Sequence, residues 1–298
     1  MQRRRTRRRT ARGSPLTEMR VLVVGAGQMG GGIAHVCAAF GNDVLLNDVS
    51  ADAVQRGIDA ITKNLSRAVS KGKLAQEQAD ETLSRISAHL DLTKPSDVSI
   101  AIEAASEDET LKKRIFTTLD KATPSAAILA SNTSSISITA LGAATKRADR
   151  VIGMHFMNPV PVMKLVEVIR GIATSDATYE AVRSLATGLG KTPVEVRDFP
   201  GFVSNRVLMP MINEAIYAHF EGVGSAEAID TVMKLGMNHP MGPLELADFI
   251  GLDTCLAIMN VLHDGFSDSK YRPCPLLKQM VAAGYLGKKS GRGFYIYT

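Results

Sequence analysis

Cysteines are few in this 298-residue chain, and long apolar runs are absent. The three cysteines, Cys37, Cys255 and Cys274, are far apart and lack the spacing of metal ligands. This excludes a disulfide scaffold and argues against a zinc site, so we expect no metal and a reducing, cytoplasmic environment. No apolar run approaches the roughly 18 residues of a membrane helix, so we do not expect the chain to cross a bilayer.

Aromatic residues make up only 5% of the chain, but hydrophobic residues make up 45%. That apolar fraction is typical of a folded protein with a real core, and it excludes global disorder. The length suggests two domains, or one domain with an appended one.

Positive charge is concentrated at the start of the chain. The formal net charge is +5, but residues 1–18 alone carry seven arginines and one glutamate, which leaves the rest near neutral. The segment has no apolar stretch of the kind found in secretory signals. Such an arm could bind nucleic acid or a membrane surface. We favour the simpler interpretation of a disordered basic tail, and expect neither nucleic acid nor a membrane as a partner.

Short apolar runs alternate with helical periodicity over most of the chain. The runs predict strands at 19–24, 43–48, 98–103, 126–130, 150–155, 164–169 and 192–196. A long helical stretch over 51–84, broken near residues 71–73, is an insertion between the second and third strands. This alternation predicts an α/β fold with a doubly wound sheet.

The pattern changes at residues 198–201, after which helical periodicity dominates and no strand is convincing before the last residues. We therefore expect a tail over 1–18, a sheet-containing domain over 19–200 and a small all-helical domain over 201–298.

A glycine-rich turn follows the first predicted strand and opens a helix. Gly25, Gly27 and Gly30 have the spacing that permits a tight turn, close approach of a pyrophosphate, and helix–strand packing. The helix start, which includes Gln28 and Met29, offers backbone amides to phosphates. The turn therefore predicts a dinucleotide site in a Rossmann-like domain.

Asp48 ends the second strand, 18 residues after Gly30. A carboxylate at this place accepts hydrogen bonds from an adenosine ribose and repels a 2′-phosphate. We therefore favour NAD as cofactor, while Arg56 keeps NADP open as an alternative.

Three polar features interrupt apolar strands. The segment 130–135 and His155 each come at the end of a predicted strand, where doubly wound sheets bind ligands. Glu167 lies within an apolar run, where an unpartnered carboxylate is costly. Paired with Glu167, the imidazole of His155 would keep one tautomer, have a raised pKa and act as a general base towards an alcohol. A core histidine, a solvent-facing glutamate and a polar turn are the alternative interpretations.

Five segments, ASNTSS, GMHFMNPVPVMKLVEVIRG, DFPGFVSNR, MGPLELADFIGLD and GKKSGRGFYIY, closely resemble the L-3-hydroxyacyl-CoA dehydrogenase family, and within it the bacterial 3-hydroxybutyryl-CoA branch. The resemblance extends nearly continuously over residues 19–298. It implies a helical hairpin over 51–84, a dimer-forming second domain, and NAD-dependent, reversible oxidation of an (S)-3-hydroxyacyl-CoA.

The resemblance also assigns roles to residues. It implies that His155 is the catalytic base and Glu167 its partner, and that Ser134 and Asn205 hold the substrate oxygen and the active-site geometry. It places five further residues near NAD: Glu107, Lys112, Asn132, Asn158 and Lys289. It places Asn64 and Lys71 against coenzyme A.

Two other functions remain open. A related dehydrogenase could oxidise a hydroxy acid without coenzyme A, such as a sugar acid, and would not need the polar face of residues 64–73. A non-catalytic NAD-sensing or nucleic-acid-binding protein would have no need for His155, Glu167, Ser134 and Asn205 together.

Overall fold

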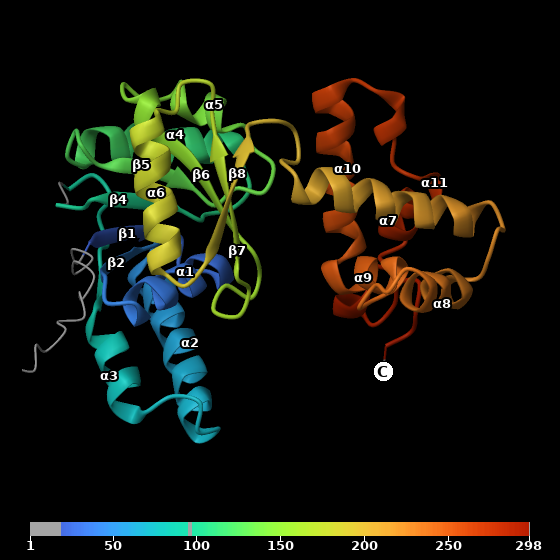
Figure 1. The fold of residues 1–298 in the computed structure, drawn as a ribbon, viewed down its shortest axis with the longest axis horizontal. Coiled ribbons are helices and arrows are strands. Elements are labelled where there is room, and N and C mark those ends of the chain that lie inside the picture. The colour runs from blue at the N-terminus through green and yellow to red at the C-terminus, as the bar shows by residue number, and fades with distance from the viewer. Residues whose placement is uncertain (1–18, 95–96, 298) are drawn as a thin grey trace, which may run out of the picture.

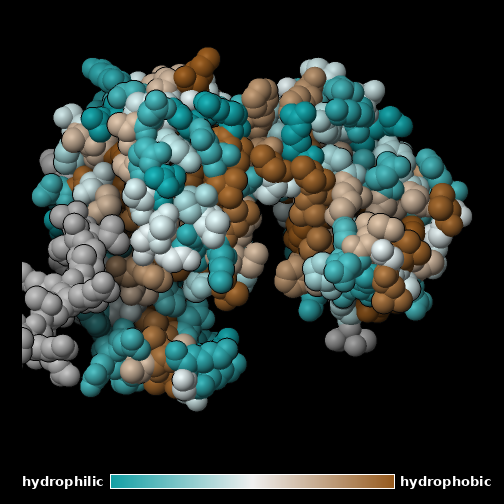
Figure 2. Space-filling view, viewed as in Figure 1, coloured by the Kyte–Doolittle hydropathy of each residue, from teal (hydrophilic) through white to brown (hydrophobic). Residues whose placement is uncertain are grey.

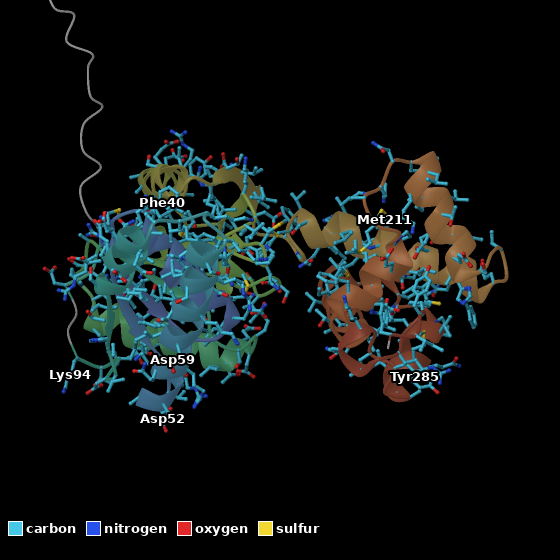
Figure 3. The ribbon with its side chains drawn as sticks, turned by 90° about the horizontal axis from the view of Figure 1, so that it is seen from below. Phe40, Asp52, Asp59, Lys94, Met211 and Tyr285 are labelled. Atoms are coloured by element: carbon cyan, nitrogen blue, oxygen red, sulfur yellow. The ribbon has the colours of Figure 1, made fainter. Side chains whose placement is uncertain are left out.

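The computed structural model describes residues 19–94 and 97–297, which form two bodies connected just before α7 (Figure 1). Figure 3, turned by 90°, shows the same two bodies side by side, so their separation is not an effect of one viewing direction. The prediction of a disordered tail over 1–18 lies outside the described residues.

Eight strands form a single sheet in the first body, in the order β3-β2-β1-β4-β5-β6-β7-β8. Strands β7 and β8 run antiparallel to the other six, and the reversal falls between β6 and β7. The strands β1 to β8 span Arg20–Val24, Asp43–Asn47, Ile86–Ala88, Ile100–Glu103, Ile128–Ser131, Val151–Phe156, Leu165–Arg170 and Thr192–Arg197.

One strand was missing from the sequence-based prediction. The third strand is Ile86–Ala88, which pairs with β2 at the edge of the sheet, rather than the run at 98–103. Its three residues are at least partly exposed, so no apolar run marks it. The predicted insertion therefore lies between β2 and this short edge strand.

Helices cover both faces of the sheet. Side chains of α1, α2, α3 and α6 share one core with one face, whereas α4 and α5 pack on the other. The hairpin of α2 and α3 projects beyond the sheet (Figure 1). The bounds of α1 to α6 are Gln28–Ala39, Ala51–Ser70, Gln76–Ser84, Glu109–Ala122, Ile138–Gly142 and Asp176–Gly188. The predicted α/β fold with a helical hairpin is confirmed.

The second body is helical and has its own core, built by all its helices except α8, which packs against it through partly buried side chains. Among described residues 201–297 the only β pairings are isolated bridges near the end of the chain. Helices α7 to α11 span Ser204–Phe220, Ala226–Gly236, Pro243–Ile250, Leu252–Phe266 and Pro275–Ala282. Within the described ranges no single helix could cross a membrane by length and apolarity, and α9 with α10 could do so only together, across a 98° bend.

Candidate active site

The glycine turn between β1 and α1 has the geometry of a phosphate cradle. Gly25 adopts a φ of +102°, and a Cβ on Gly30 would lie 1.7 Å from the carbonyl oxygen of Gly25. Neither position therefore accepts a side chain. At Gly27, in contrast, an added Cβ would meet nothing within 4 Å, so the space beside the turn is open. Because α1 begins at Gln28, directly after this open position, and no side chain among the described residues caps it, its first amides are available to a phosphate and the turn fits a dinucleotide.

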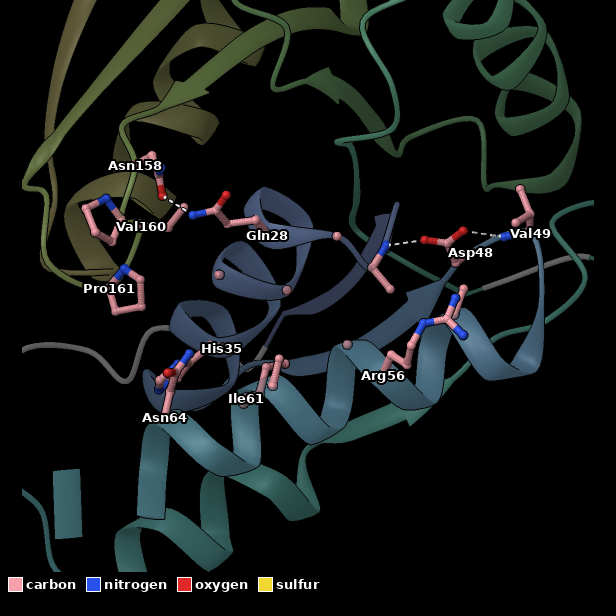
Figure 4. Close-up of a pocket in the computed structure, with 18 residues that line it drawn as sticks. Gln28, His35, Asp48, Val49, Arg56, Ile61, Asn64, Asn158, Val160 and Pro161 are labelled. Carbon is pink, nitrogen blue, oxygen red and sulfur yellow. Dashed lines mark hydrogen bonds between the residues drawn. The ribbon is translucent and has the colours of Figure 1, made fainter. Parts of the chain in front are cut away.

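Asp48 lies beside this turn and faces two cavities. Its two carboxylate oxygens accept hydrogen bonds from the backbone amides of Ala26 and Val49, both at 2.6 Å, which fixes the plane of the carboxylate. One cavity, of about 520 Å³, runs from Asp48 over the ends of β1 and β4. The other, of about 740 Å³, contains Arg56 and lies between α1, α2 and the loop after β6 (Figure 4).

The reversal between β6 and β7 brings His155 and Glu167 together. In this antiparallel pair the two residues stand directly opposite each other, so their side chains share one face. The Nδ1 atom of His155 lies 2.8 Å from Oε2 of Glu167, and both side chains are almost buried. An ionised carboxylate only accepts hydrogen bonds, so Nδ1 carries a proton, and in the neutral ring Nε2 then has the free lone pair.

The carboxylate of Glu167 has further donors from the second body. Ser204 donates its hydroxyl to Oε2 at 2.7 Å, and the amides of Val203 and Ser204 donate to Oε1 at 3.2 and 2.9 Å. Burial alone would raise the pKa of Glu167, but the hydrogen bonds from His155 and Ser204 outweigh it and hold the pKa below its usual range. Glu167 therefore stays ionised as a counter-charge for an imidazolium.

Ser134 is held by a second carboxylate. Glu107 accepts hydrogen bonds at one oxygen from the hydroxyl groups of Thr133, Ser134 and Ser135 and from two of their amides, at 2.6 to 3.2 Å. Burial would raise the pKa of Glu107, but nearby Lys112 and these donors together lower it. The turn after β5 is therefore fixed around one ionised side chain.

Lys112 connects this turn to a buried charge. Its ammonium lies 3.3 Å from Glu107 and 2.6 Å from Glu103, and the side chains of Lys112 and Glu103 are 1% and 0% exposed. Glu103 also accepts hydrogen bonds from Ser131 and from the amide of Ala105. An unpaired charge at this depth would be strongly destabilising, so each of these two side chains depends on its partner.

A third cavity, of about 490 Å³, lies between the two bodies. Eight of the predicted site residues line it: Met29, Glu107, Lys112, Asn132, Ser134, His155, Asn158 and Asn205. Asn205 donates its side-chain amide to the backbone oxygen of Ser134 at 3.0 Å, and so connects α7 to the turn after β5. Asn132 accepts from the amide of Phe156, and Gln28 donates to Asn158.

Besides the residues of the glycine turn and Asp48, three predicted binding residues do not line this cavity. Asn64 lines the 740 Å³ cavity, close to His35 in Figure 4. Lys71 is exposed at the end of α2 and is not among the residues that line it. Lys289 forms an ion pair with Asp253 at the start of α10, at 2.6 Å. The predicted roles of all three remain predictions.

Sequence reasoning missed Ser204 and Glu103. Ser204 lies within DFPGFVSNR, just where a helix is expected to begin, and serines are common at helix starts for structural reasons alone. Nothing in the sequence pattern therefore marks it as a site residue. Glu103 had a signal, because it ends an apolar strand at the same sheet edge as the glycine turn. Among described residues no group of histidine, cysteine and acidic side chains could hold a metal ion.

A phosphate cradle and a histidine–carboxylate pair at the same sheet edge define a dinucleotide-dependent dehydrogenase that acts on an alcohol or a ketone. The family comparison gives the same class. The model of the 3-hydroxyacyl-CoA dehydrogenase NAD-binding domain matches residues 20–199, and that of the C-terminal domain matches residues 201–297. The chain belongs to the 3-hydroxyacyl-CoA dehydrogenase family.

Individual relatives agree over nearly the whole chain. A probable 3-hydroxybutyryl-CoA dehydrogenase of Bacillus subtilis is 60% identical over 93% of this chain and 96% of its own length. The 3-hydroxybutyryl-CoA dehydrogenase of Bradyrhizobium diazoefficiens is 59% identical, over 93% and 95%. A crystal structure of the (S)-3-hydroxybutyryl-CoA dehydrogenase of Ralstonia eutropha matches with a TM-score of 0.92 at 52% identity, covering 95% of this chain and 100% of that one.

Proposed function

We propose that this enzyme reversibly oxidises short-chain (S)-3-hydroxyacyl-CoA, with 3-hydroxybutyryl-CoA as its main substrate, to the 3-oxoacyl-CoA. The observation that carries the proposal is the 2.8 Å contact between His155 and Glu167 beside the interdomain cavity. The names of the similar proteins from Bradyrhizobium and Ralstonia support the choice of substrate.

In the proposed mechanism, Nε2 of His155 removes the proton of the substrate 3-hydroxyl group. Bound at the glycine turn, NAD supplies the acceptor for the hydride that leaves C3. The Glu167 carboxylate stabilises the imidazolium that forms, and the hydroxyl of Ser134 orients the substrate oxygen. The side-chain amide of Asn205 keeps Ser134 in place by donating a hydrogen bond to the backbone oxygen of Ser134. In the reverse direction the imidazolium returns the proton.

NAD rather than NADP is our proposal for the cofactor. It rests on the fixed carboxylate of Asp48, which accepts from the Ala26 amide and would face a ribose bound beside the turn. A 2′-phosphate at that place would meet a negative charge. Arg56 lines the neighbouring cavity and is the side chain that could offset this charge.

We propose that coenzyme A lies along the 740 Å³ cavity, with Asn64 on its wall, and that its nucleotide end reaches Lys71 at the end of α2. Changing Lys71 to alanine should raise the KM for acetoacetyl-CoA far more than that for acetoacetyl-pantetheine, because the lysine acts on the nucleotide end. The matched control is Lys73→Ala, in the same exposed turn. Equal effects of Lys71→Ala on both substrates would remove it from the coenzyme A site.

We also propose a homodimer formed through the helical body, in a cytoplasmic setting. Exposed apolar side chains are frequent on that body: Val203, Val207, Phe220, Val223, Val232, Leu235, Met237 and Phe249. Figure 2 shows apolar surface gathered on the side of this body that faces the sheet. Sedimentation of the full-length protein distinguishes a dimer from a monomer. The three cysteines are free and buried, which supports the proposal of a reducing compartment such as the cytoplasm.

The decisive experiment follows NADH oxidation in the near ultraviolet with acetoacetyl-CoA, with NADPH and with a CoA-free keto acid as the comparison arms. We expect rapid turnover with NADH and acetoacetyl-CoA only. Rapid turnover of the CoA-free acid would favour a hydroxy-acid dehydrogenase instead.

A further inference from the structure

Ser204 shares an oxygen with the catalytic histidine. Its hydroxyl and Nδ1 of His155 both approach Oε2 of Glu167, at 2.7 and 2.8 Å. The other oxygen, Oε1, is held by two backbone amides, so the carboxylate has little freedom to turn away. Ser204 begins α7, in the other body and 37 residues from Glu167 along the chain.

A donor on a shared carboxylate oxygen draws negative charge toward itself. The carboxylate then interacts less strongly with the positive imidazolium on the same oxygen. We propose that Ser204 is a positioning residue that sets the strength of the His155–Glu167 pair, and with it how readily Nε2 of His155 accepts the substrate proton. This inference rests on the proposed function.

The other ionisable side chains that line this cavity are Glu107 and Lys112. Lys112 lies 3.3 Å from Glu107 and 2.6 Å from Glu103, so these three side chains together carry one net negative charge. The ring of Phe202, with its centroid 6.1 Å from that of His155, adds an apolar wall and no charge. Besides His155, the hydroxyl of Ser204 is the side-chain group of this cavity that donates a hydrogen bond to Oε2 of Glu167. It is uncharged, so removing it leaves the net charge of the site as it is.

Changing Ser204 to alanine removes the hydroxyl and leaves both backbone donors in place. We expect the midpoint of the pH–rate profile to move upward by about 0.5 to 1 pH unit, which corresponds to one hydrogen bond of ordinary strength. Oxidation of 3-hydroxybutyryl-CoA, which needs neutral imidazole, should lose rate at neutral pH. Reduction of acetoacetyl-CoA, which needs imidazolium, should extend to higher pH.

Two matched variants accompany this measurement. Ser204→Thr keeps the hydroxyl and should keep the wild-type midpoint. Ser135→Ala removes a hydroxyl from the neighbouring carboxylate of Glu107, so it should leave the midpoint unchanged whatever it does to the rate. A role of Ser204 in packing alone would lower the rates in both directions equally without moving either midpoint, and that result would overturn the proposal.

A second readout separates this proposal from the proposed function. The titration of the His155 ring can be followed by NMR in the free enzyme, with His155→Gln used to assign its signal among the six histidines. An upward shift in Ser204→Ala supports the inference even if acetoacetyl-CoA is not the substrate. An unchanged ring titration in an enzyme active on acetoacetyl-CoA refutes the inference and leaves the function standing.

Discussion

Replacing Glu167 with glutamine is the most informative single perturbation, because it keeps the shape of the side chain and removes its charge. The two amides of Val203 and Ser204 require an acceptor at the position of Oε1. The glutamine oxygen must therefore stay there, and its NH₂ group takes the position of Oε2, opposite Nδ1 of His155. A donor at that position favours the tautomer with the proton on Nε2, which cannot accept a proton from the substrate.

The loss of charge can be given a magnitude. Two opposite unit charges about 4 Å apart interact by ~4 kcal/mol at an effective dielectric constant of about 20. Each 1.36 kcal/mol in the barrier changes the rate tenfold. Withdrawing this stabilisation from the imidazolium that forms in the reaction should therefore lower kcat by about a thousandfold, and the wrong tautomer adds to the loss.

The assay is the steady-state rate in both directions, with NADH affinity and thermal unfolding measured on the same protein. We expect affinity for NADH to change by no more than a few-fold, because Glu167 does not line the cavities beside the glycine turn. The matched control is Glu195→Gln on β8, a glutamate that pairs with Arg170 away from the site. If Glu167→Gln keeps turnover within tenfold of the wild type while correctly folded, the pair is structural and the reasoning fails.

Three further outcomes are expected. Asp48→Ser should weaken the binding of NAD by roughly tenfold, because the ribose loses its hydrogen-bond acceptor. It should also reduce the preference for NAD over NADP, measured as the ratio of the two kcat/KM values, because the 2′-phosphate is no longer repelled. Glu103→Gln alone should lower the melting temperature, since it removes the nearer of the two carboxylates that pair with the buried Lys112, whereas adding Lys112→Met should restore most of the stability and not the activity. The pKa of Glu107 is lower in the folded protein than in the unfolded chain, so its ionised form stabilises the fold. This stabilisation is complete at a pH above the pKa of the unfolded chain, and it is lost as the pH falls through the pKa of the folded protein. The difference in melting temperature between wild type and Glu107→Gln should therefore shrink from pH 5 towards pH 3, and a constant difference would contradict this.

The parts of the molecule that depend on short-range pattern were predicted well. The strand at 19–24, the turn from Gly25 to Gly30 and the helix after it are contiguous, and two of the glycines answer to local geometry: Gly25 has a positive φ, and a Cβ on Gly30 would meet the carbonyl oxygen of Gly25. Periodicity likewise predicted a long helical stretch over 51–84 with a break near residues 71–73, where α2 ends, and the family resemblance implied that this stretch is a hairpin. In contrast, the edge strand Ile86–Ala88 escaped notice, because a half-exposed strand of three residues has no apolar pattern.

The sequence by itself determined the α/β fold, the helical second body and the dinucleotide turn, since these follow from local periodicity and backbone sterics. The tertiary structure decided which groups meet. His155 faces Glu167 because β6 and β7 pair antiparallel in one register, and a shift by one residue would turn the two side chains to opposite faces. Ser204 reaches the same carboxylate because α7 begins beside it. Strand register and helix docking depend on packing between distant segments, which periodicity along the chain does not specify.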